Sequence, residues 1–163
     1  MEMKYGVLTG IFCVVFRSFE FFMGWPDSNI GQYSAYIGIL MMAAGAYYCV
    51  RETRTMENGQ LSFGKSFMTA LTVCFIISIM IGAHAYVYNS TVAPERKEVM
   101  VKEYHQAYKK EGKTEEEMKV LDERVRLFFS PMSQLMSEGG GTIIAGLFVS
   151  LVIAGFTRTR KPE

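Results

Sequence analysis

A pair of charged residues inside an apolar run is the sharpest chemical feature of the chain. Arg17 and Glu20 lie three residues apart within residues 5–25, so a helix would place them on neighbouring positions of one face. An ionisable group buried in lipid is costly and marks a functional site by default. Such a pair could bind a lipid headgroup, a substrate or a partner helix. The alternative is that the two charges only neutralise each other.

Two further ionisable residues stand at the ends of later apolar runs. His84 lies close to Tyr86 and Tyr88, and Glu138 precedes three glycines. A lone histidine in this setting typically forms an interhelical hydrogen bond, whereas a histidine with a carboxylate partner could relay protons. We therefore take Arg17, Glu20, His84 and Glu138 as a candidate polar intramembrane site that binds lipid or a partner. The hypothesis requires the four side chains to converge on one cavity.

Nothing in the sequence predicts catalysis. The chain has two histidines, no Cys-x-x-Cys pair and no glycine-rich phosphate loop, so we expect no catalytic residue, no metal, no cofactor and no nucleic acid. The three cysteines, Cys13, Cys49 and Cys74, lie within or at the end of apolar runs. We interpret them as small buried residues.

The elements that must position these residues follow from an uneven distribution of charge. Residues 94–130 hold nine Lys/Arg and nine Asp/Glu, out of 17 and 16 in the 163-residue chain. The other long stretches are apolar for about 20 residues or more, which is the length of a helix that crosses a ~30 Å hydrocarbon layer. The sequence predicts a single all-α domain, an integral membrane four-helix bundle. Its spans are expected at about 5–25, 30–50, 65–90 and 134–157, with a charged extramembrane helical hairpin at 94–130 between spans three and four.

The charged segment has its own helical signals. Pro94 would start a first helix, and Gly112 would break it. Thr114 and Glu117 have the spacing of a capping box at the start of a second helix. Each helix has one apolar face, so the two helices would bury these faces against each other. The face of the first helix consists of Met100, Tyr104, Ala107 and Tyr108, and that of the second of Met118, Leu121, Val125 and Phe128.

Signals at the start of the last span differ in kind. Ser130 would cap the segment and Pro131 would take its first helical position. The glycines 139–141 weaken a helix, so we expect a hinge, an unwound turn or a loop there.

Small residues recur at helical spacing in three of the predicted spans. Close approach of helices in lipid depends on such stripes, so they predict helix packing within the bundle or against another subunit. The stripes are Gly31, Gly38 and Gly45; Cys74, Ser78 and Gly82; and Thr142, Gly146, Ser150 and Ala154.

The distribution of Lys and Arg predicts the orientation. Both termini and the loop 51–65 carry basic residues, whereas the loop between spans one and two carries none. The rule that basic loops stay inside therefore places both termini in the cytoplasm and the hairpin outside, in the periplasm of a bacterial inner membrane.

The order of these features resembles a known family. Leu61-Ser62-Phe63-Gly64-Lys65-Ser66-Phe67 opens span three, and Phe128-Phe129-Ser130-Pro131 precedes the last span. With the Tyr47-Tyr48 end of span two and the basic tail, this pattern is similar to the family called domain of unknown function 4199, four-span inner-membrane proteins of Bacteroidota. The resemblance covers nearly the whole chain and implies no known activity. Genes of that family often lie beside a membrane-anchored family-2 glycosyltransferase that uses polyprenyl phosphate, and this association suggests a partner.

Two functions remain open from the sequence. The first is a non-enzymatic membrane subunit that associates with a partner protein or with itself, accessory to a polyprenyl-phosphate glycosyltransferase in envelope glycan assembly. The alternative is a small transporter, channel subunit or lipid-handling protein that uses the candidate polar site.

Overall fold

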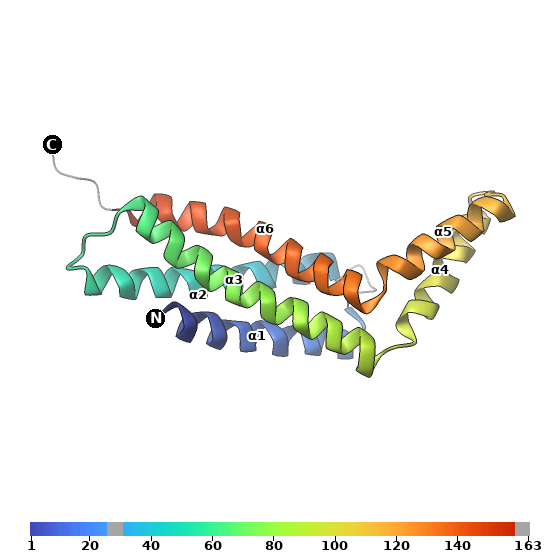
Figure 1. Cartoon of the computed structure of the whole chain (residues 1–163), viewed down its shortest axis with the longest axis horizontal. Helices are drawn as coiled ribbons and strands as arrows, with labels where there is room; N and C mark the ends of the chain where they lie inside the picture. Colours follow the sequence, from blue (N-terminus) through green and yellow to red (C-terminus); the bar gives the residue numbers. More distant parts are fainter. Residues whose placement is uncertain (26–30, 159–163) are drawn as a thin grey trace. The chain divides into compact units, whose positions relative to one another are not determined.

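The computed structural model describes residues 1–25 and 31–158, and in these ranges it contains helices and no strands. The elements in chain order are α1 (Glu2–Phe22), α2 (Gly31–Met56), α3 (Phe63–Val87), the π-helical turn η2 (Tyr88–Val92), α4 (Arg96–Lys110), α5 (Glu115–Phe128) and α6 (Pro131–Thr157) (Figure 1). The predicted all-α class is confirmed for the described residues. The predicted start of span two at residue 30 lies outside them.

Four of these helices, α1, α2, α3 and α6, are long and apolar enough to cross a membrane. They cover the four predicted spans with shifted bounds. α2 continues to Met56, beyond the predicted end at residue 50, and the Thr53 hydroxyl donates to the Cys49 carbonyl at 2.9 Å within this extension. The turn then forms at Asn58 and Gly59, which both have positive φ, 54° and 82°.

The end of α3 differs from the sequence prediction. The predicted span three ends at about residue 90, whereas the π-helical turn carries the helical path on to Val92. The Asn89 amide donates to the Ala85 carbonyl at 2.8 Å, which keeps this polar side chain within the helical path. α4 begins at Arg96, since Pro94 takes part in the turn that precedes it.

The chain divides into two compact units. The first comprises Met1–Ile81 and Gly140–Glu163, and the second comprises Gly82–Gly139. In the first unit, small and medium apolar side chains of α1, α2, α3 and α6 and the loop residue Leu61 form one core: Cys13, Met42, Ala46, Cys49, Val50, Leu61, Ala70, Val73, Cys74, Ile77 and Ile153. The predicted burial of all three cysteines is confirmed.

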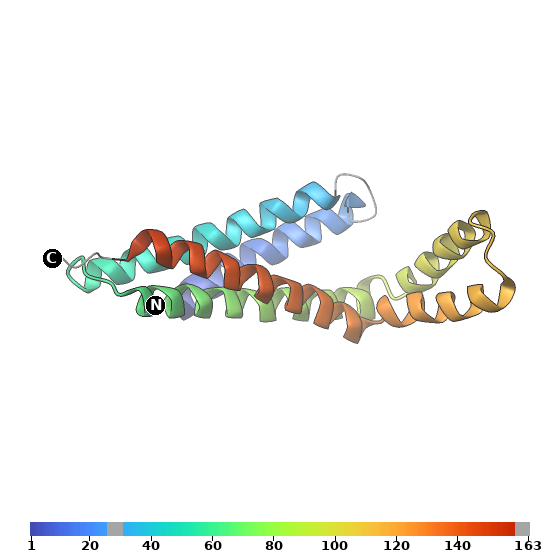
Figure 2. The same ribbon diagram turned by 90° about the horizontal axis from the view of Figure 1, so that it is seen from above.

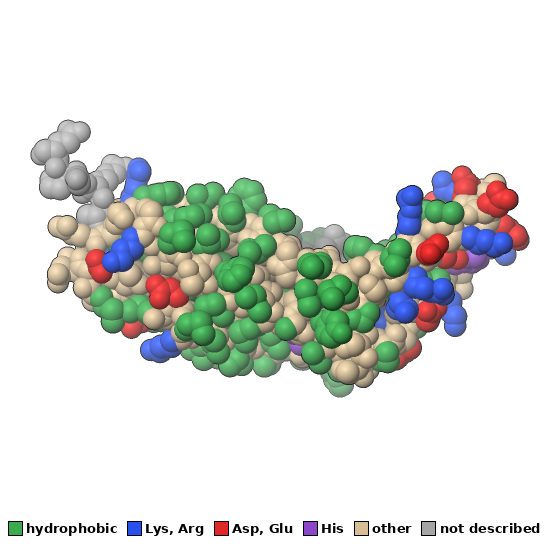
Figure 3. All heavy atoms as spheres, in the orientation of Figure 1, with side chains coloured by type: hydrophobic (Ala, Val, Ile, Leu, Met, Phe, Trp, Pro, Cys, Tyr) green, Lys and Arg blue, Asp and Glu red, His purple; other side chains and the backbone are tan. Residues whose placement is uncertain are grey.

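Large apolar side chains also cover the outside of the first unit, as green spheres show in Figure 3. Examples with at least half of their surface exposed come from all four long helices: Phe12, Val15, Leu40, Met68, Phe148 and Phe156. Contiguous apolar surface on this scale is unusual for a soluble protein and suits contact with lipid tails.

In the second unit, α4 and α5 pack against each other around Met100, Val101 and Val125, with Tyr108 and Phe129 at the margin. Phe128 belongs to the predicted apolar stripe, but its side chain is 54 % exposed. Phe129 packs instead: it follows Val125 by four residues, and its N–H still donates to the Val125 carbonyl at 2.9 Å, so the two side chains share one face of the helix.

The caps formed as the sequence predicted. The Thr114 hydroxyl accepts from the Glu117 N–H, and the Glu117 carboxylate accepts from the Thr114 N–H at 2.9 Å. The Ser130 hydroxyl accepts from the Ser133 N–H at 3.3 Å, and Pro131 is the first residue of α6. The predicted unwound turn or loop at residues 139–141 is wrong, because these glycines lie inside the continuous helix α6. The two units meet between Gly139 and Gly140, and a hinge there stays a prediction.

Candidate functional site

The charged pair of α1 forms one buried ion pair. The Arg17 Nη1 donates to the Glu20 Oε2 at 2.9 Å, as their spacing of three residues on a helix allows. The Glu20 side chain is only 1 % exposed, whereas that of Arg17 is 23 % exposed. The pair is therefore asymmetric, with the carboxylate inside and the guanidinium at the margin.

The second oxygen of this carboxylate has a different environment. Glu20 Oε1 is buried and has no hydrogen-bond partner among the described residues. Leaving a buried acceptor unsatisfied costs roughly 1–3 kcal/mol, and more for a charged group. This oxygen could accept a hydrogen bond from a hydroxyl or an ammonium, bind a proton, or contact a cation.

His84 and Glu138 belong to the second unit, whereas Arg17 and Glu20 belong to the first. His84 is half-buried on α3, and its ring lies 6.2 Å from that of Tyr88. Glu138 is half-buried in the first half of α6. The structure brings Arg17 and Glu20 together, and convergence of all four residues stays a prediction.

The small residues of α3 and α6 lie at a close helix–helix contact in the first unit. A Cβ added at Gly146 would lie 2.6 Å from the Cys74 Cβ, so only a glycine fits there. The Ser150 hydroxyl bonds to the Gly146 carbonyl at 2.6 Å and lies 3.8 Å from the Cys74 sulfur. Ser78 and Ala154 are also buried.

In the second unit, Gly82 packs against the start of α6. A Cβ on Gly82 would lie 3.1 Å from the Leu135 carbonyl oxygen and 3.4 Å from the Gly139 Cα. The glycine at 139 thus permits close backbone approach within a continuous helix. Thr142, the first member of the predicted α6 stripe, is half-buried.

The glycines of α2 have unequal surroundings. A Cβ on Gly45 would overlap the Thr9 side chain of α1, whereas nothing lies within 4 Å of a Cβ on Gly38. Gly31 is half-buried at the first position of the helix.

A polar layer at one end of the first unit was missed by sequence reasoning. The Tyr5 hydroxyl donates to the Glu52 carboxylate, which joins α1 to α2, and the hydroxyls of Ser66 and Thr157 are bonded between α3 and α6. Thr53, beside Glu52, is also buried. In the sequence, each of these apolar runs has a hydroxyl-bearing or acidic residue near one end. A single polar residue forms no periodic pattern within its run, so it does not reveal the layer.

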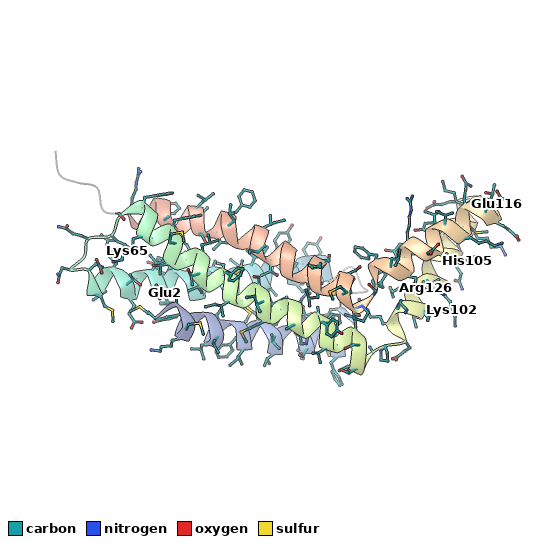
Figure 4. All side chains as sticks on the ribbon, viewed as in Figure 1. Glu2, Lys65, Lys102, His105, Glu116 and Arg126 are labelled. Atoms are coloured by element: carbon teal, nitrogen blue, oxygen red, sulfur yellow. The ribbon has the colours of Figure 1, made fainter. Side chains whose placement is uncertain are left out.

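Polar contacts between α4 and α5 were also missed. His105 Nδ1 lies 2.7 Å from Asp122 Oδ2, and Arg126 donates to Glu98 at 2.9 Å. Figure 4 labels His105 and Arg126 on these helices. At the α5 N-terminus, the hydrogen bond from the Thr114 N–H holds the pKa of the Glu117 carboxyl below its usual value.

The fold defines a class: a small all-helical protein with four helices long and apolar enough for a multi-pass membrane protein. Within its described residues, no group of three or more His, Cys, Asp or Glu could hold a metal ion.

The chain belongs to the family described as "Protein of unknown function (DUF4199)", whose model matches residues 4–159. The resemblance noted from the sequence is thereby confirmed. No curated protein and no solved structure matches the chain.

Proposed function

We propose that the protein is a non-enzymatic integral membrane subunit that associates with a partner membrane protein or with itself. Its α4–α5 pair would serve as a docking element outside the bilayer, in the periplasm of a bacterial inner membrane. Both termini would lie in the cytoplasm.

The observation that carries this proposal is the self-contained construction of the α4–α5 pair. Its apolar side chains meet in a small core, and the His105–Asp122 and Glu98–Arg126 contacts join the two helices. Many remaining charged side chains point outward, among them the exposed Lys102, Glu116 and Arg124. A charged helical face held in one conformation favours specific recognition of a protein, because complementary charges select the partner.

The family association supplies a candidate partner. A membrane-anchored family-2 glycosyltransferase that uses polyprenyl phosphate would lie in the same membrane as this chain, together with its acceptor lipid. An accessory subunit would then stabilise or position that enzyme in envelope glycan assembly without doing chemistry itself.

Co-expression with such a glycosyltransferase tests the proposal. We expect both chains to remain together in mild detergent, with a defined ratio by mass spectrometry. Arg124→Glu on α5 should weaken the association, whereas Arg158→Glu, the same charge reversal at the end of α6, should leave it intact. Recovery of the chain as a lone monomer under several gentle conditions would contradict the proposal.

A second candidate function is favoured by the unsatisfied oxygen of Glu20. A buried carboxylate with one free oxygen could bind a proton or a small cation on its way through the membrane. This transporter or channel function predicts a proton or monovalent-cation flux in proteoliposomes that Glu20→Gln abolishes. Absence of flux with the wild-type protein would end it.

A further inference from the structure

Two exposed cations lie beside the contact between α1 and α2. Lys4 and Arg51 are both exposed, and the Lys4 ammonium lies 5.7 Å from the centre of the Tyr5 ring. Each directly precedes a member of the pair Tyr5 and Glu52, whose side chains are hydrogen-bonded. Neither forms a salt bridge within the described part of the chain.

Helix geometry places these two cations on one side of the α1–α2 pair. The two helices are antiparallel neighbours, because Tyr5 meets Glu52 while Thr9 meets Gly45 (Figure 2). Successive residues turn by about 100° around a helix. In an antiparallel pair, the residues that precede two facing residues therefore turn toward the same side, so Lys4 and Arg51 flank one surface.

The same surface continues as an apolar face along both helices. Leu8 and Tyr48 follow one turn from the cations and are 50 % and 55 % exposed. Further along the same face the exposed side chains are apolar: Phe12, Val15, Ile37 and Leu40. The other side of α1 is covered, since Gly6 and Gly10 approach Ile76 and Met80 of α3.

Most nearby carboxylates are already engaged. Glu52 accepts from the Tyr5 hydroxyl, and Glu2 lies 3.3 Å from the N-terminal ammonium. Lys65, at the same end of this unit as Glu2 in Figure 4, is paired with Glu57 at 2.7 Å. Lys4 and Arg51 therefore carry positive charge that no carboxylate of the described residues neutralises by direct contact.

We propose that Lys4 and Arg51 bind the phosphate of an anionic phospholipid whose acyl chains lie on the apolar face of α1 and α2. This inference rests on the membrane placement in the proposed function, and it adds a specific ligand. Arg and Lys are the side chains that pair with phosphate, and basic pockets at membrane interfaces bind anionic headgroups. Tyr48 lies where an interfacial aromatic belongs, between the charged and the apolar parts of the surface. A soluble phosphate would gain nothing from that apolar part.

Native mass spectrometry of the full chain in a neutral mild detergent tests the proposal. The probes are phosphatidylglycerol and phosphatidylcholine with identical acyl chains. We expect phosphatidylglycerol to bind the wild type about tenfold more tightly, which corresponds to about 1.4 kcal/mol. The variant Lys4→Gln/Arg51→Gln should lose this preference. The control Lys102→Gln/Arg124→Gln removes the same charge from α4 and α5 and should keep it.

Three outcomes would overturn the proposal. The first is a wild type that binds phosphatidylglycerol no more tightly than phosphatidylcholine, and the second is a Lys4/Arg51 variant that keeps the full preference. The third is soluble glycerol 3-phosphate that displaces phosphatidylglycerol as well as the lipid itself does. Where that variant fails to fold, the salt dependence of the wild type decides, because an electrostatic preference must fall as salt screens it. A preference that salt leaves unchanged would contradict the proposal. A lone monomer in the co-expression experiment, together with a phosphatidylglycerol preference here, would end the subunit function alone, so the two failures are distinguishable.

Discussion

At the scale of single residues, close helix contact depends on which glycines face a neighbour. Gly45 lies against Thr9, and Gly146 lies against Cys74, whereas Gly38 has open space where a side chain would begin. A methyl group added at Gly45 or Gly146 should therefore lower the stability of the fold, whereas one added at Gly38 should raise it.

Gly45→Ala should lower the free energy of unfolding by about 1–3 kcal/mol, because the added methyl overlaps Thr9 in a packed contact. Gly38→Ala should raise it by up to about 1 kcal/mol, because alanine is the better helix former and meets nothing. Unfolding of the purified protein in mixed micelles, titrated with a denaturing detergent, measures both. The double variant Thr9→Ala/Gly45→Ala should recover part of the loss, and equal effects of the two glycine substitutions would contradict the contact.

The Arg17–Glu20 pair predicts strong coupling between two substitutions. Arg17→Met leaves the Glu20 carboxylate buried without its cation, a change that costs about 3–5 kcal/mol in fully buried pairs and less here because Arg17 is 23 % exposed. Arg17→Met/Glu20→Met removes both charges and should be more stable than Arg17→Met. A double-mutant cycle in the same micelles measures the coupling, and additive effects would show that the pair contributes nothing.

At the scale of the elements, the confirmed sequence predictions are those that depend on residues close together in the chain. Four apolar runs predicted four long helices, and the Thr114–Glu117 and Ser130–Pro131 signals predicted two helix starts, because caps depend on residues close in the chain. The glycines 139–141 led to the wrong prediction of an unwound turn or a loop, because intrinsic helix propensity ignores tertiary packing. Here Gly139 lies inside α6 and close to Gly82. Tyr5 and Glu52 could not be paired from the sequence, since their meeting depends on the register between two helices.

The start of α5 gives a pH-dependent prediction. The pKa of the Glu117 carboxyl is lowered from 4.5, chiefly by the hydrogen bond from the Thr114 N–H. Its stabilisation of the helix start is therefore complete above the unfolded value and is lost as the pH falls through the lowered value. Amides of the first α5 turn should exchange faster in Glu117→Gln than in the wild type at pH 7, after correction for intrinsic rates. As the pH falls through the lowered pKa of Glu117 the two should converge, and a difference that persists unchanged down to the acid limit of the native state would contradict the capping role.

At the scale of the whole molecule, helix length and charge bear on how the chain meets a membrane. α1 has 21 residues, about 31 Å, which matches a ~30 Å hydrocarbon layer. α6 has 27 residues, about 40 Å, so part of it must extend beyond that layer or tilt within it. In the first unit, the end with the N-terminus carries Lys4, Arg51, Arg54 and Lys65, and the described part of α6 leads into Arg158. Basic residues so close to the ends of spans favour the cytoplasmic side.

This orientation predicts opposite labelling of two loops. Lys113→Cys, in the turn between α4 and α5, should react with a membrane-impermeant maleimide in cells whose outer membrane is permeabilised. Ser62→Cys, in the loop between α2 and α3, should react only after the inner membrane is broken. Both parent positions are exposed, and the native cysteines are buried, so accessibility across the membrane decides the result. Residues 94–130 hold nine basic residues of their own, but nine acidic residues accompany them and the segment is long, so it should still be translocated. If Ser62→Cys were labelled before Lys113→Cys, the topology would be the reverse of the one proposed. The proposed docking element would then lie in the cytoplasm, and the cations Lys4 and Arg51 in the periplasm.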